Sequence, residues 1–163
     1  QAPREEHMHA ACRVLRYIKG TPDCGLLLQA QNDLRLVSYC DSDWGACPIT
    51  RCLLTGYLVI LGGSPISWKT EKQITVSRSF AEAEYHSMAV TTSELVWLKS
   101  FLASLGVFHT SPMHLYCDSH ATFHFAKDPL FHEQMKHIEI DCHFVHEKLE
   151  YADFVVSYLP SQH

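Results

Sequence analysis

The 163-residue sequence lacks several features that mark common protein classes. No apolar run approaches the roughly 20 residues of a membrane-spanning helix, so we expect no membrane partner. No glycine-rich phosphate loop and no nucleophile elbow is present, and neither repeats nor low-complexity segments occur. The length suits one globular domain with a single core.

The seven cysteines include no C-x-x-C pair, and their number is odd. Both observations argue against a disulfide framework. We therefore expect reduced, mostly buried cysteines and an intracellular protein.

An excess of positive charge is also absent, because 13 Lys and Arg residues stand against 18 Asp and Glu residues, a formal net charge of -5. This balance argues against a strongly basic nucleic-acid-binding protein. It does not exclude nucleic acid as a partner, since bound divalent metal ions would add positive charge that a residue count omits.

Two stretches share the motif Tyr-Cys-Asp-Ser at the end of an apolar alternation. The first stretch, Leu34 to Trp44, places Asp41 at the end of a predicted strand. The second, Met113 to Ser119, places Asp118 at the end of another. Active sites of α/β sheets lie outside the strand ends, so the two carboxylates converge if the strands are neighbours. Asp43 is expected to point to the opposite side of its strand and is the weaker candidate.

A long helix is predicted from Ser79 to Gly106, between these two strands. Its apolar stripe comprises Met88, Leu95, Leu98, Leu102 and Leu105. Extended backwards, the stripe reaches Glu84, whereas Glu82 falls off it. A carboxylate at the head of a buried stripe needs a hydrogen-bond partner or a cation, so Glu84 is the third candidate acid.

The other segments predict a mixed five-stranded α/β sheet flanked by helices. They are a helix at Arg4–Lys19, strands at Leu26–Gln29, Gly56–Leu61, Pro65–Lys69 and Phe154–Leu159, and helices at Ser119–Ala126 and His132–Leu149.

Three converging carboxylates repel one another, so one would be protonated unless cations are bound. Mg²⁺ prefers such oxygen ligands, and two ions about 4 Å apart would activate water for phosphodiester hydrolysis. The acids therefore indicate hydrolysis of a nucleic-acid backbone. The alternative is that Asp41 and Asp118 merely begin turns and that Glu84 is exposed.

A series of motifs runs along residues 34–163: SYCDSDWGACP, TGYLVILGG, ISWKTEKQITVSRS, AEAEY, ELVWLKSFLASLGV, LYCDS, FHEQMKHIEIDCHFVHEKL and VVSYLPS. In this order they resemble the ribonuclease H domain of a copia-type retrotransposon Pol polyprotein. HMHAACRVLRYIKGT resembles the C-terminal end of the preceding reverse transcriptase. The resemblance implies that residues 1–33 are the tail of the reverse transcriptase or connection segment, and that residues 34–163 are a ribonuclease H domain lacking its last helix.

This resemblance implies a ribonuclease H-like fold and metal-dependent cleavage of the RNA strand of RNA/DNA hybrids during reverse transcription. The family's first acid falls on Asp41, its helical glutamate on Glu84 and its third acid on Asp118, which would hold two Mg²⁺ or Mn²⁺ ions. The implied partners are the hybrid and the reverse transcriptase portion of the same polyprotein. The implied location is the cytoplasm, within virus-like particles.

The family's fourth acid lies beyond the final strand, whereas this chain ends at His163. We therefore expect weak activity with Mg²⁺ and partial rescue by Mn²⁺. The alternative function is a catalytically weak or inactive ribonuclease H-like remnant that acts as a structural or nucleic-acid-binding module. A transposase or integrase is disfavoured, because those enzymes carry their acids in the order Asp, Asp, Glu.

Further residues are candidates for contact with the nucleic acid, through stacking or charge. They are Trp68, Lys69, Lys72, Arg78 and Ser119. Trp97 is instead expected in the core. Cys142 falls on the apolar stripe of its helix, whereas His143 and His146 share the opposite face, so we expect no structural zinc.

Overall fold

The computed structural model describes residues 2, 4–30, 33–43, 53–73, 77, 79–120, 122–123 and 138–160. Their helices and strands are, in chain order, α1 (Glu5–Lys19), β1 (Leu36–Asp43), β2 (Leu54–Leu61), β3 (Ser64–Lys72), α2 (Phe80–Ser104), β4 (Met113–Cys117), α4 (Glu139–Glu150) and β5 (Phe154–Tyr158). None of the described helices is both long and apolar enough to cross a bilayer.

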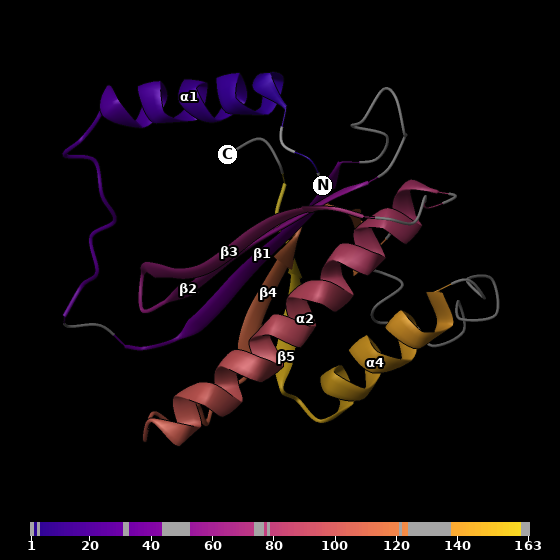
Figure 1. Cartoon of the computed structure of the whole chain (residues 1–163). Coiled ribbons are helices and arrows are strands. Elements are labelled where there is room, and N and C mark those ends of the chain that lie inside the picture. Colours follow the sequence, from indigo (N-terminus) through magenta and orange to yellow (C-terminus); the bar gives the residue numbers. More distant parts are fainter. Residues whose placement is uncertain are drawn as a thin grey trace.

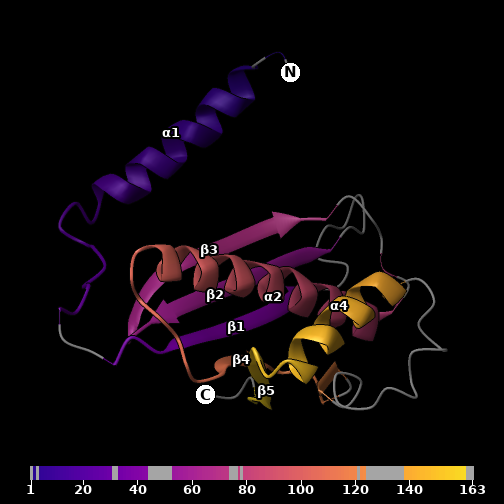
Figure 2. The same ribbon diagram turned by 90° about the horizontal axis from the view of Figure 1, so that it is seen from below.

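The five strands form one mixed sheet in the order β3-β2-β1-β4-β5 (Figure 1). Strands β1, β2 and β3 are antiparallel neighbours, whereas β1, β4 and β5 run parallel. Helices α2 and α4 pack on the same face of the sheet (Figure 2). The predicted mixed five-stranded α/β architecture is confirmed.

The hairpin between β2 and β3 depends on two glycines. Gly62 and Gly63 have φ angles of 54° and 84°, in the left-handed region that glycine enters at little cost. This tight turn sets β3 beside β2 and completes the antiparallel side of the sheet.

The central helix α2 begins at a capped turn. The side chain of Ser79 accepts a hydrogen bond from the main-chain N–H of Glu82, which satisfies one of the donors left open at a helix start. The predicted apolar stripe is buried as far as Leu102. It is wrong for Leu105, which is 64% exposed because the helix ends at Ser104 and Gly106 turns the chain away with a φ of 84°.

The prediction that Trp97 lies in the core is also wrong. The side chain is 56% exposed and stacks on Phe101, with ring centroids 5.3 Å apart. Trp97 precedes the buried Leu98, and consecutive residues lie about 100° apart around a helix, so it projects to the side.

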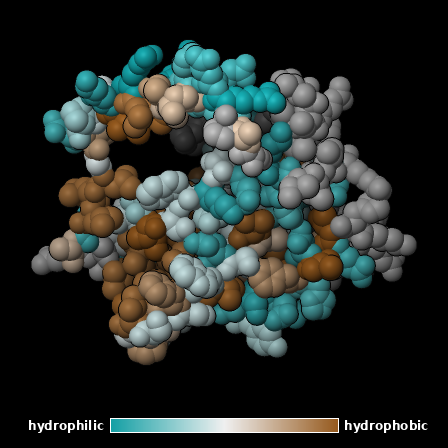
Figure 3. Space-filling view, viewed as in Figure 1, coloured by the Kyte–Doolittle hydropathy of each residue, from teal (hydrophilic) through white to brown (hydrophobic). Residues whose placement is uncertain are grey.

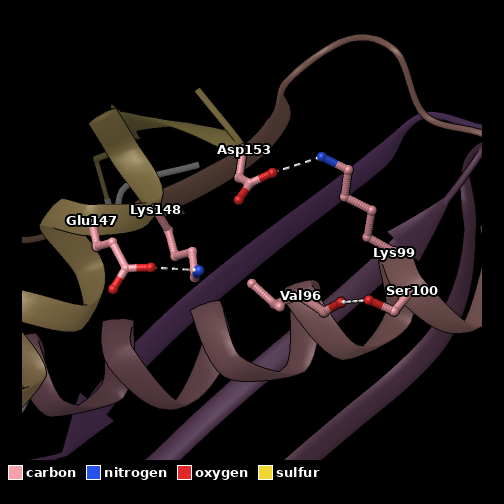
Figure 4. A network of polar contacts seen from close by, with 6 residues as sticks. All are labelled: Val96, Lys99, Ser100, Glu147, Lys148 and Asp153. Carbon is pink, nitrogen blue, oxygen red and sulfur yellow. Dashed lines mark hydrogen bonds and ion pairs between the residues drawn. The ribbon is translucent and has the colours of Figure 1, made fainter. Parts of the chain in front are cut away.

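The C-terminal half of α2 is fastened to the turn between α4 and β5. Lys99 Nζ lies 2.7 Å from Asp153 Oδ1 (Figure 4). The main-chain oxygen of Asp153 also accepts a hydrogen bond from Met113 N–H. Through these two contacts Asp153 links α2, β4 and the start of β5 at the end of the sheet where β4 begins.

The N-terminal segment differs from the rest, because α1 buries none of its residues. The predicted strand at Leu26–Gln29 is wrong, since these residues belong to no strand of the sheet and Leu26, Leu27 and Leu28 are exposed. Apolar side chains gather on the surface along this segment and at the end of α2 (Figure 3).

Some predictions extend beyond the described residues. The helix predicted to begin at His132 is present from Glu139, and residues 131–137 lie outside the described part. Of the helix predicted at Ser119–Ala126, residues 119, 120, 122 and 123 are described, and the last three are helical. Trp44 and Arg78 lie outside it as well.

Candidate metal centre

The structure brings together the three acids that the sequence singled out. Asp41 lies near the end of β1, Asp118 directly follows β4, and Glu84 lies in the second turn of α2. One carboxylate oxygen from each residue can be chosen so that all three lie within 4.8 Å of one another.

Strand pairing explains this convergence. In the parallel ladder between β1 and β4, Cys40 is paired with Cys117, so the acid that follows each cysteine emerges at the same end of the sheet. Helix α2 packs against β1 and supplies Glu84 from the face that the sheet buries.

Glu84 is the most enclosed of the three acids, with 1% of its surface exposed. Its Oε1 atom accepts a hydrogen bond from Ser42 Oγ at 2.8 Å, whereas its Oε2 atom is buried and makes no hydrogen bond with a described residue. Burial raises the pKa of Glu84 to about 7, assisted by the charges of Asp118 and Asp41 and opposed by the Ser42 hydroxyl.

The pKa of Asp41 is also raised, first by burial and then by the charge of Asp118. Two of the three acids are therefore held where neighbouring charge and low solvation disfavour their ionised forms. A cation among them would remove this cost.

Two serines that the sequence analysis did not select hold the acids in place. Ser42 bonds to Glu84, and Ser87 Oγ donates to the main-chain oxygen of Asp41 at 2.8 Å. A sequence signal existed, because Ser87 lies three residues after Glu84 and so on the same side of the helix.

The expectation that Asp43 points away from Asp41 is wrong. Strand β1 continues through Asp43, and side chains two residues apart in a strand project to the same face. Both residues are exposed, while Ser42 between them is buried on the α2 side.

The two cysteines that precede Asp41 and Asp118 are 5% and 2% exposed. Burial raises the pKa of the Cys40 thiol and raises that of Cys117 to about 11. Both thiols are therefore neutral near pH 7, and a metal at this site would have oxygen ligands.

The described candidates for contact with nucleic acid do not share one surface, and Arg78 lies outside the described residues. Ser67 hydrogen bonds to Glu94 of α2, so Lys69 shares that face of β3, whereas Trp68 and Lys72 project to the other. Trp68 is 61% exposed, and Lys69 forms an ion pair with Glu71.

Ser119 is 6% exposed and its Oγ accepts a hydrogen bond from Thr122 N–H, so the hydroxyl caps the turn after Asp118. Contact of these residues with nucleic acid stays a prediction.

The donor set of the site fits a divalent cation. Three carboxylates supply only oxygen ligands, which Mg²⁺ and Mn²⁺ prefer, and the buried Oε2 of Glu84 is available as one of them. Among the described residues this is the only such group of three possible ligands.

Comparison with known proteins finds similar sequences and structures, although no family model matches the chain. Over 148 residues, 91% of the chain, the sequence is 44% identical to the retrovirus-related Pol polyprotein from transposon RE1 of Arabidopsis thaliana, of which it spans 10%.

Two solved structures share the fold at low sequence identity. LC11-RNase H1 in complex with an RNA/DNA hybrid has a TM-score of 0.52 at 14% identity, with 78% of this chain and 87% of that chain covered. The foamy viral protease-reverse transcriptase in complex with double-stranded DNA has a TM-score of 0.55 at 15% identity, with 99% and 25% covered. Over 91% of its length the chain is therefore homologous to part of the Pol polyproteins of copia-type retrotransposons, and it has a ribonuclease H fold.

Proposed function

We propose that this chain is a metal-dependent endonuclease that hydrolyses the RNA strand of RNA/DNA hybrids during retrotransposon reverse transcription. The observation that carries the proposal is the convergence of Asp41, Glu84 and Asp118 within 4.8 Å at one end of the sheet. The relationship to a transposon Pol polyprotein and the ribonuclease H fold support it.

In this proposal the three acids hold two Mg²⁺ or Mn²⁺ ions. When bound, the ions would supply an activated water and would stabilise charge on the leaving oxygen. The protein's own contribution is placement: β1 and β4 fix Asp41 and Asp118 at one edge, and α2 holds Glu84 with one oxygen bonded to Ser42.

Selection of the hybrid would depend on the 2′-hydroxyl groups of the RNA strand, which distinguish RNA from DNA at a given site. Trp68 and Lys72 share the face of β3 that α2 does not cover, and Trp68 is exposed there. We assign this face to contact with the nucleic acid, with Lys69, Arg78 and Ser119 as further candidates.

We assign residues 1–33 to the tail of the reverse transcriptase and residues 34–163 to the ribonuclease H domain. Helix α1 is amphipathic but buries none of its residues, so its apolar face lacks a packing partner among the described residues. Isolated helices of about 15 residues are marginally stable in water. The reverse transcriptase portion of the same polyprotein would pack against this face of α1. The location would be the cytoplasm, within virus-like particles.

The proposal is tested with the purified chain and its Asp118→Asn variant on labelled RNA/DNA hybrid, double-stranded RNA and duplex DNA, each with Mg²⁺ and with Mn²⁺. We expect cleavage of only the hybrid's RNA strand, weak with Mg²⁺ and stronger with Mn²⁺, and none by the variant. Hybrid binding without cleavage under both metals would instead support the non-catalytic module, and equal cutting of duplex DNA would contradict a ribonuclease H.

A further inference from the structure

Two buried serines tie β1 and α2 together in both directions at the candidate metal centre. Ser42 of β1 donates a hydrogen bond from Oγ to Oε1 of Glu84, and Ser87 of α2 donates from Oγ to the main-chain oxygen of Asp41. Both distances are 2.8 Å, and the serines are 5% and 0% exposed. Ser42, which follows Asp41 in the sequence, therefore bonds to Glu84, and Ser87, which lies one turn after Glu84, bonds to the main chain of Asp41.

Strand and helix periodicity place these serines where they are. Ser42 follows Asp41 directly, so its side chain projects to the opposite face of β1, toward α2. Ser87 lies three residues after Glu84, on the same side of α2. A sliding of α2 along β1 would break both hydrogen bonds together, so the pair fixes the register of the two acids.

The bond from Ser42 also selects how Glu84 presents its carboxylate. With Oε1 bound, Oε2 is the atom left without a hydrogen bond among the described residues, and it is buried. A buried carboxylate oxygen without a partner is costly, which points to a ligand at that position. Asp41 and Asp118 each place an oxygen within 4.8 Å of the Glu84 carboxylate.

We propose that Ser42 and Ser87 are positioning residues for divalent-cation binding: Ser42 orients the carboxylate of Glu84, and Ser87 holds the backbone that carries Asp41. The inference rests on the proposed function in one respect, that a divalent ion binds the three acids. Neither serine need touch the ion, because each acts through an acid.

Loss of a hydrogen bond that orients a metal ligand typically lowers metal affinity 10- to 100-fold. We expect Ser42→Ala to weaken Mn²⁺ binding about 10-fold or more. Ser87→Ala should have a smaller effect, about 3-fold, because its hydroxyl bonds to the backbone of Asp41 and also lies 3.3 Å from the main-chain oxygen of Gly56.

Ser38 provides a matched control on the same strand. It lies on the same face of β1, is 0% exposed, and donates from Oγ to the main-chain oxygen of His114 at 3.2 Å. Ser38→Ala therefore removes a buried hydroxyl and its hydrogen bond without touching an acid. Ser42→Thr keeps the hydroxyl and should keep Mn²⁺ affinity within about threefold of the unmodified chain.

The experiment is a calorimetric Mn²⁺ titration of the metal-free full chain, its four serine variants and Asp118→Asn, with circular dichroism to verify folding. Weaker binding in Ser42→Ala and Ser87→Ala than in Ser38→Ala, with recovery in Ser42→Thr, supports the inference. Equal affinity in all serine variants, with binding lost in Asp118→Asn, overturns it and leaves the proposed function standing. Absence of Mn²⁺ binding in the unmodified chain overturns both. If Ser42→Ala does not fold, the comparison of Ser87→Ala with Ser38→Ala decides.

Discussion

The two ends of α2 hold acidic side chains in different ways. Near its C-terminal end, Lys99 lies 2.7 Å from Asp153, and both side chains are about one-third exposed. Near its N-terminal end, Glu84 is almost fully buried, and its described partner is the neutral hydroxyl of Ser42. One acid is neutralised by the protein itself, whereas the other is surrounded by further acids.

This difference separates a structural contact from a candidate site. The Lys99–Asp153 pair links elements and is complete without a ligand. Burial, assisted by neighbouring carboxylates, raises the pKa of Asp41 and of Glu84, so binding a divalent cation would relieve a cost already present in the fold. Substitutions at the two ends of α2 should therefore have different effects on metal binding and on stability.

The largest effect is expected from Asp118→Asn, which removes one anionic ligand from the acidic end. Cleavage of the RNA/DNA hybrid should fall at least about 100-fold, because the remaining acids would hold the ions in a poorer geometry. Thermal unfolding of the metal-free variant should occur at an equal or higher temperature, since one repulsive charge is lost. Hybrid cleavage at the unmodified rate in a purified preparation would contradict the role of Asp118.

Glu84→Gln and Glu82→Gln compare two glutamates on the same helix. Glu84 is buried among the acids, whereas Glu82 lies in the first turn and is half-buried. We expect Glu84→Gln to reduce hybrid cleavage at least about 100-fold and Glu82→Gln to leave it within about threefold. Similar losses in the two variants would show that burial beside Asp41 does not set the role of Glu84.

The stability of the metal-free protein should fall as the pH rises. The pKa of Glu84 is about 7 in the folded chain against an ordinary value of 4.5, so the folded state binds more protons than the unfolded state between these values. The free energy of unfolding should decrease by roughly 3 kcal/mol from pH 4.5 to pH 8. Urea unfolding across this range measures it.

His86 shifts stability in the same direction, because its hydrogen bond to Asp141 raises its pKa. Glu84→Gln isolates the share that belongs to Glu84: the variant should lose most of the decrease, and saturating Mn²⁺ should flatten the curve of the unmodified chain. An unchanged slope in the variant would contradict the raised pKa of Glu84.

The smallest effect is expected at the other end of α2. Lys99→Met removes an ion pair that is partly solvated, so stability should fall by about 1 kcal/mol or less. Mn²⁺ affinity should stay unchanged, since the pair is linked to the turn before β5 and not to the acids. A loss of Mn²⁺ binding in Lys99→Met would contradict the claim that the Lys99–Asp153 pair acts independently of the three acids.

The sequence predicted the parts of the site that periodicity controls. Alternation identified the strands that carry Asp41 and Asp118, and the helical stripe identified Glu84 through Met88 and Leu95. The motif resemblance pointed to the same three residues.

Contacts between residues far apart in the sequence could not be predicted in the same way. The bond from Ser42 to Glu84 joins residues 42 positions apart, and no local pattern encodes it. Trp97 and the segment Leu26–Gln29 were mistaken because apolar composition predicts burial, whereas exposure depends on which neighbours pack there. Asp43 was misplaced through the strand period itself, which puts it on the face of Asp41.

The most direct test of the central account is the anomalous diffraction of a crystal of this chain soaked in Mn²⁺. We expect a peak among the carboxylates of Asp41, Glu84 and Asp118, within coordination distance of at least two of their oxygens, with Glu84 contributing Oε2. A crystal in millimolar Mn²⁺ with no peak among these carboxylates, or with manganese bound only elsewhere, would contradict it.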